Sequence, residues 1–208
     1  TSVNLCMTYL AQRACEDIFK RFETPFIRLY NYYSPDRTEQ QYEQLFEFFG
    51  ARADLSEMKE KAYDMLSDFA EEYSNLSFAV SDSVAGSSVE MAETLIDAGL
   101  DVKFVFRNVI LPEDRASLKR LCEKAPDLKI FSGVHPSVRA NPEKLPHADV
   151  IAGLDAGYFE PSSVSVNFSS EQTHFGYEAL TSLITALEQG IASPKTLKEQ
   201  MSGSYLTV

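Results

Sequence analysis

Several residue types and signature motifs are missing from this 208-residue sequence, and each absence excludes a class of protein. There is no tryptophan, and the three cysteines are too few, and odd in number, for a disulfide framework. No C-x-x-C pair, H-E-x-x-H, G-x-S-x-G, P-loop or G-x-G-x-x-G motif occurs, and nine glycines leave little material for a dinucleotide-binding loop. The cysteine usage predicts a cytoplasmic protein.

Positive charge and long apolar runs are also scarce. Acidic residues outnumber basic ones by 31 to 19, which gives a formal net charge of −12. Such a chain does not neutralise a phosphate backbone and is repelled by an anionic membrane surface, so no nucleic acid and no membrane are expected as partners. No segment reaches the roughly 20 consecutive apolar residues of a membrane helix, and the first ten residues lack the basic start of a signal peptide.

What the sequence does contain is an alternation of short β-rich runs and amphipathic helical periods. This alternation predicts an α/β fold of two Rossmann-like parallel-sheet blocks joined by a long helix. The strands are expected at residues 2–6, 26–30, 77–81, 101–106, 128–133, 149–153 and 163–168. The helices are expected at about 8–22, 36–49, 54–74, 87–98, 112–122 and 175–189.

These elements suggest a domain organisation. It consists of a partial block over 1–53, a bridging helix over 54–75, a second block over 76–190 and a tail over 191–208. The stretch 134–162 contains four prolines and little periodicity, so we expect long loops there.

Side-chain patterns give more local expectations. Asp36 can cap the second helix, with Phe49 facing inward, and Gly99 occupies the left-handed position that ends a helix. Cys15 and Cys122 fall on apolar helix faces and are expected in the core.

The first candidate site is the small-residue loop SDSVAGSS (81–88), between a strand and a helix. Its backbone N–H groups and the helix dipole can bind an anion, with Ser83, Gly86 and Ser87 as the binding residues. The alternative, which the frequency of such turns favours, is a tight turn with serine caps.

Two further candidates lie at strand ends. The segment SGVHP (132–136) could bring Gly133 and His135 to a ligand, because ligands of open α/β sheets sit beyond the carboxyl ends of strands. A solvated loop histidine is the alternative. Cys6, at the end of the first strand, could ligate a metal as a thiolate or pack as a small buried apolar residue. His174, at a helix start, is expected at the surface.

The order of several segments resembles the nitrogenase component 1 family. These segments are NLC, ETPFIRLY, FEFFG, SFAVSDSVAGSS, IDAGLDV, APDLKIFSGVHPS, a loop containing Leu-Pro and HFGYEAL. The resemblance covers nearly the whole chain and corresponds to the second and third Rossmann-like domains of that family. It therefore implies the carboxyl-terminal portion of a longer polypeptide, in keeping with a first residue that is not methionine.

The resemblance also implies a function and partners. Members are cytoplasmic oxidoreductase subunits that pair with a homologous subunit, as α2β2 assemblies or homodimers. An ATP-dependent iron–sulfur reductase protein supplies their electrons. An iron–sulfur cluster or metallocofactor is implied, with most cluster ligands in the first domain, outside this chain.

Some positions depart from the family pattern. The cofactor cysteine corresponds to Met7, with Cys6 one residue away, and the segment SVSVNFSS lacks the expected histidine. His135 replaces a lysine beside the cofactor, and serines replace an arginine-bearing loop. A dinitrogen-reducing site is therefore not expected, and a serine-lined acidic pocket is better suited to a neutral or cationic molecule.

Three functions are compatible with these residues. The first is a nitrogenase-like oxidoreductase subunit with a substrate or metallocofactor between its two blocks, inactive as an isolated fragment. The second is a non-catalytic binding or cofactor-assembly module of the same fold. The third is an unrelated sugar-nucleotide transferase, for which Asp82 offers a carboxylate but the sequence shows no convincing basic partner.

Overall fold

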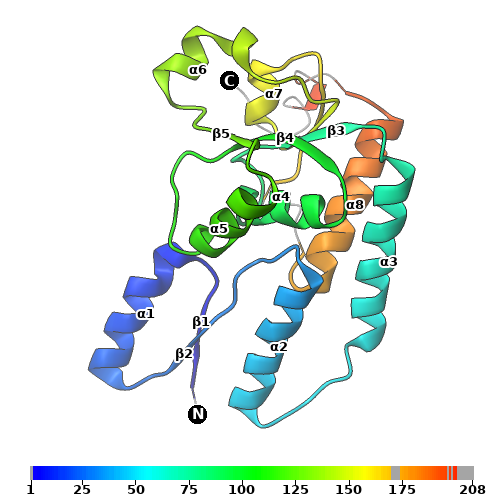
Figure 1. Cartoon of the computed structure of the whole chain (residues 1–208). Helices are drawn as coiled ribbons and strands as arrows, with labels where there is room; N and C mark the ends of the chain where they lie inside the picture. The colour runs from blue at the N-terminus through cyan, green and yellow to red at the C-terminus, as the bar shows by residue number, and fades with distance from the viewer. Residues whose placement is uncertain (1, 170–173, 196, 198, 201–208) are drawn as a thin grey trace.

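The computed structural model describes residues 2–169, 174–195, 197 and 199–200. Its amino-terminal part, called here the two-stranded block, contains a small parallel sheet and ends before a long helix (Figure 1). The elements of this part are β1 (Asn4–Cys6), α1 (Tyr9–Phe22), β2 (Phe26–Arg28) and α2 (Pro35–Phe49), and the long helix α3 (Ser56–Glu72) follows it.

The remainder, called the five-stranded block, alternates strands and helices up to the last helix α8. Its elements are β3 (Ser77–Val80), α4 (Ser88–Asp97), β4 (Asp101–Phe106), α5 (Asp114–Lys124), β5 (Lys129–Phe131), α6 (Pro136–Ala140), the 3-10 turn η1 (Pro142–Lys144), β6 (Val150–Ala152), α7 (Asp155–Phe159), β7 (Val164–Val166) and α8 (Tyr177–Ala192).

The five-stranded sheet is entirely parallel, in the order β5-β4-β3-β6-β7. The chain runs outward from β3 to β5 and then crosses back to β6, which is the order of a doubly wound sheet. The α/β class with parallel sheets is therefore confirmed, and all seven expected strands occur within their expected ranges.

Both faces of this sheet are buried because its side chains alternate. In β3, Phe78 and Val80 point into the larger core, which α3, α4 and α8 cover, whereas Ala79 points into the smaller core under α6 and α7. In β4, the alternate residues Phe104 and Phe106 both point into the smaller core. Figure 1 shows α6 and α7 on one side of the sheet and the longer helices on the other.

The two-stranded block is covered less completely. Helix α1 packs on β1 and β2, while α2 packs against α3 and α8, and α3 lies along α8 (Figure 1). The expected bridging helix therefore contributes to the core of the five-stranded block, through Ala62, Leu66 and Phe69.

Several local expectations need correction. Ser34, not Asp36, caps α2, because the Ser34 hydroxyl accepts from the backbone N–H of Arg37 and Pro35 occupies the first helical position. Phe49 is exposed at the end of that helix. Cys122 is exposed, whereas Cys15 is buried as expected.

The expected loop region 134–162 contains α6, η1 and α7 in addition to its expected strand, since proline at their first positions starts α6 and η1. Gly99 does adopt a positive φ after α4. Within the described residues, every helix is too short or too polar to span a bilayer.

Candidate functional site

The candidate site is a cavity of about 410 Å³ between the two blocks. The segments that line it follow β1, β2, β3 and β4, so the carboxyl ends of strands from both parallel sheets converge on one space. This is where open α/β folds bind ligands. Its described lining consists of Met7, Thr8, Leu10, Tyr30, Asn31, Tyr32, Ala85, Gly86, Ser87, Glu90, Arg107, Leu111, Glu113, His174 and Phe175. We call this space the strand-end cavity.

One wall forms where the segment after β2 docks on the β3–α4 loop. The Tyr33 hydroxyl donates a hydrogen bond of 2.6 Å to the carbonyl of Ala85. Gly86 has φ of +76°, and a Cβ atom there would lie 3.0 Å from the carbonyl oxygen of Asn31. Glycine is therefore required at position 86, because a side chain would separate the two segments.

A second wall is an ion-pair cluster around Arg107, the residue after β4. Its Nε and Nη2 donate to Asp114 at 2.9 and 3.1 Å, and its Nη1 donates to Asp82 at 3.3 Å. The Ser87 hydroxyl donates to the same Asp114 carboxylate at 2.5 Å. Asp114 is fully buried, so Arg107 compensates a charge that would otherwise be costly.

The floor of the cavity contains Glu90, a buried residue in the first turn of α4. Its two carboxylate oxygens accept from the backbone N–H groups of Tyr33 at 2.9 Å and Ser34 at 3.1 Å. Arg37 lies 3.5 Å away. Burial raises the pKa of Glu90 to about 7 despite these donors, so its charge changes near neutral pH.

Two acceptor atoms of the lining are buried without a hydrogen-bond donor among the described residues. They are Oε2 of Glu113 and Oδ1 of Asn31. Burial, followed by the charge of the neighbouring Asp114, raises the pKa of Glu113. Burial also raises the pKa of Tyr30 to about 12, so this phenol stays neutral. The described residues that line the cavity therefore include two buried oxygen acceptors without a donor, beside aromatic rings.

The structure places the site residues expected from the sequence in different regions of the molecule. Gly86 and Ser87 line the strand-end cavity, and the Ser87 hydroxyl caps α4 by accepting from the backbone N–H of Glu90. The serine-cap alternative is confirmed at this position. Ser83 instead faces α7, where its hydroxyl donates to Asp155 at 2.7 Å.

Gly133 and His135 lie outside this lining, in the turn after the edge strand β5. Gly133 faces the rings of Phe106 and Phe159. His135 is exposed and caps α6, where its Nδ1 accepts from the backbone N–H of Ser137 at 3.2 Å. Their binding role stays a prediction.

Cys6 is fully buried and lies outside the described lining of the cavity. Its thiol donates to the carbonyl of Thr8 at 3.3 Å, and burial and the adjacent Cys15 thiol raise its pKa. A thiol that resists ionisation is a poor metal ligand, so this environment favours the packing alternative. The residues after it, Met7 and Thr8, do line the cavity.

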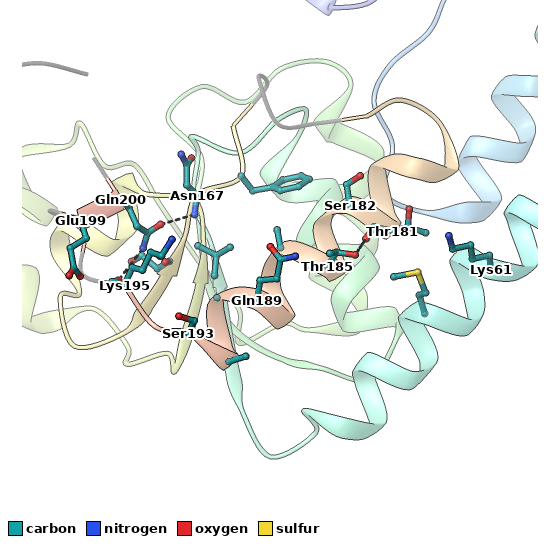
Figure 2. A pocket seen from close by; sticks show the side chains of 17 residues that line it. Lys61, Asn167, Thr181, Ser182, Thr185, Gln189, Ser193, Lys195, Glu199 and Gln200 are labelled. Atoms are coloured by element: carbon teal, nitrogen blue, oxygen red, sulfur yellow. Dashed lines mark hydrogen bonds between the residues drawn. The ribbon is translucent and has the colours of Figure 1, made fainter. Parts of the chain in front are cut away.

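A larger cavity, of about 910 Å³, lies along α8 and the sheet-edge strand β7. Figure 2 shows its hydroxyl and amide side chains, among them Thr181, Thr185 and Gln189 from α8. None of the site residues expected from the sequence lines it. Its lining comes from α3, α8, the edge strand β7 and the segment after α8 rather than from several strand ends, so it has less of the architecture of a ligand site.

Sequence reasoning missed Arg107, Glu90 and Glu113. A detectable signal existed for Arg107, since a charged residue directly after the buried strand DVKFVF is placed at the carboxyl edge of the sheet. Arg107 donates to Asp82, so this guanidinium is already paired with carboxylates of the chain. No comparable signal marked the two glutamates, whose positions are ordinary helix starts.

Comparison with known proteins decides the family. The model of "Nitrogenase component 1 type Oxidoreductase" matches residues 1–189. The chain belongs to this family. The resemblance seen in the sequence is therefore confirmed, over most of the chain.

A solved structure described as "Nitrogenase Cp1 at pH 6.5" has the same fold, with a TM-score of 0.70 and 15% sequence identity. The match covers 100% of this chain and 48% of that one, so the chain spans about half the length of this nitrogenase component 1 structure. A search of curated proteins found no match.

Proposed function

We propose that this chain forms part of a nitrogenase-like oxidoreductase subunit and that its substrate binds in the strand-end cavity. One observation carries the proposal: segments following four strands, from two parallel sheets, converge on that cavity. A paired homologous subunit and an ATP-dependent iron–sulfur reductase protein are the expected partners, since members of the family are multi-subunit and work with such a protein.

Family members generally bind iron–sulfur clusters, and the residues of this chain can be tested against that requirement. Among the described residues, no group of three or more His, Cys, Asp or Glu side chains is arranged to hold a metal ion. Cys6 is buried, and the cavity lining contains no cysteine. The described residues do not fit a cluster, and we place the redox centre of the proposed enzyme in another part of the protein.

The alternative is a binding or cofactor-assembly module without turnover. A different observation favours it: the described lining has unsatisfied acceptors and no group of metal ligands, and such a cavity can hold a molecule without reducing it. Dinitrogen reduction is not part of either proposal.

Electron acceptance distinguishes the two functions. The polypeptide containing this chain, purified anaerobically with its paired subunit, is mixed with the reduced reductase protein and ATP. We expect the visible absorbance of the reductase to report oxidation that requires both ATP and the complex. Oxidation that is equal without the complex, or without ATP, would contradict the oxidoreductase proposal and leave the binding module.

A further inference from the structure

We infer that the strand-end cavity takes a small organic cation with N–H donors, such as a protonated amine, rather than an anionic ligand. The inference rests on the proposed function for the location of the site and adds the chemical class of the ligand. It depends on the charges, the unsatisfied acceptors and the aromatic rings of the lining.

The charge balance of the lining is the first argument. Arg107 is the one arginine or lysine among the described lining residues, whereas Glu113 and Glu90, the latter paired with Arg37 at 3.5 Å, both line the space. All three guanidinium nitrogens of Arg107 already donate to Asp114 or Asp82. The guanidinium is thus committed to two carboxylates, and a bound anion would have to compete with both.

The positive end of α4, the usual place for an anion in such a fold, is also occupied by the protein. The Ser87 hydroxyl accepts from the backbone N–H of Glu90, and the Asp114 carboxylate accepts from Ser87. The Ser87 hydroxyl therefore takes an N–H group that an anion could use, and the Asp114 carboxylate next to it would repel a phosphate or carboxylate ligand.

The unsatisfied acceptors indicate what the ligand must supply. Oε2 of Glu113 and Oδ1 of Asn31 have no donor among the described residues, and a buried acceptor without a donor is costly. A ligand with N–H groups satisfies such atoms, whereas a carboxylate or phosphate brings only more acceptors.

The aromatic rings and the size of the cavity point to the same class. Tyr30, Tyr32 and Phe175 line the cavity, and aromatic faces attract organic cations. The volume of about 410 Å³ fits a small molecule. A polyanionic metallocofactor would meet the same acidic lining with no uncommitted arginine or lysine among the described residues.

The test compares two probes of equal chain length but opposite charge, butane-1,4-diamine and butanedioate, at one ionic strength and near neutral pH. Binding to the whole chain is followed by calorimetry and by amide chemical shifts of residues 30–32 and 85–87. We expect the diamine to bind at least about tenfold more tightly than the dianion, since a desolvated charge pair contributes more than the 1.4 kcal/mol that tenfold represents.

Two variants locate the effect. Glu113→Gln should weaken diamine binding by about tenfold or more, whereas Glu123→Gln, the same change at an exposed site on α5, should leave it unchanged. Leu10→Trp should block binding without changing charge, because Leu10 is an exposed residue of the lining. Thermal unfolding of each variant confirms that it is folded.

Tighter binding of the dianion, binding of neither probe, or equal loss in Glu113→Gln and Glu123→Gln would overturn the inference. These outcomes are independent of the electron-acceptance assay. Diamine binding without electron acceptance would support the cation site and contradict the oxidoreductase proposal. Electron acceptance without diamine binding would support the oxidoreductase proposal and contradict the cation site.

Discussion

The two blocks of the molecule differ in how much of their apolar surface they bury themselves. In the five-stranded block, Phe104 and Phe106 of β4 have no exposed surface, since helices cover both faces of the sheet. In the two-stranded block, Leu10 and Phe22 at the two ends of α1 are 79% and 70% exposed. The five-stranded block has a complete core, whereas the two-stranded block has one layer of helix on two short strands.

This difference shows what holds the site together. The two-stranded block is joined to the other block by the apolar packing of Tyr33 and Tyr42 and by the buried polar contacts of Tyr33, Arg37 and Glu90. The strand-end cavity lies at that junction. Its geometry therefore depends on polar contacts between the blocks as well as on the core, and substitutions in the two regions should have different consequences.

The largest effect is expected in the shared core. Phe69→Ala on α3 should lower the free energy of unfolding by about 3–5 kcal/mol, because it removes a buried ring that packs on Phe78 and Tyr73. Phe22→Ala, at an exposed position of α1, is the matched control and should change it by less than about 0.5 kcal/mol. Denaturant unfolding measures both changes. If the two variants lose similar amounts of unfolding free energy, the blocks do not differ in how well they are packed.

The next effect depends on pH. The folded protein raises the pKa of Glu90 from 4.5 to about 7, so it holds this proton more tightly than the unfolded chain does. The free energy of unfolding should therefore fall as pH rises from about 4.5 to 7, by at most about 3 kcal/mol.

Glu90→Gln should remove most of this slope, whatever its effect on stability at a single pH, and the raised pKa of Glu113 leaves a smaller slope of the same sign. Glu93 and Arg37 lie beside the carboxylate. Urea unfolding of both proteins between about pH 5 and 8 measures the difference. If the free energy of unfolding falls as steeply with pH in the variant as in the parent protein, the pH dependence belongs to another group.

A smaller effect is expected at the junction. Tyr33→Phe deletes the donor to the carbonyl of Ala85 and should cost about 1–3 kcal/mol, the penalty of an unsatisfied buried acceptor. Amide hydrogen exchange should accelerate in β1 and α1 more than in β4. Tyr158→Phe, which removes an exposed hydroxyl, is the control. Uniform acceleration in both blocks would mean that they unfold as one unit.

The smallest effect concerns Cys6. If this residue packs in the core, Cys6→Ser should lower the free energy of unfolding by about 1–2 kcal/mol, and Cys122→Ser, at an exposed site, by almost nothing. Anaerobic incubation with iron and sulfide, followed by metal analysis, tests the other possibility. Unchanged stability together with loss of bound iron in Cys6→Ser would establish the ligand role.

The local features were predictable because they depend on neighbouring residues. The strand DVKFVF and the helix over 54–74 follow from hydrophobic periodicity, and the turn at Gly99 follows from glycine after a helical period. The residue that caps a helix depends on more than one neighbouring residue. Ser34 and Asp36 are both good capping residues, and the choice of Ser34 depends on Pro35 at the first helical position.

The α/β class, the positions of the seven strands found among the described residues and, by resemblance, the family could all be predicted from the sequence. The tertiary structure decided which strand ends meet. Strand order places His135 after an edge strand, whereas Arg107, Glu90 and Glu113 surround the strand-end cavity. The reason is physical: periodicity is local to a segment, but the neighbours of a strand end depend on how sheets wind and dock, through contacts between residues more than 50 positions apart, such as Tyr33 with Glu90.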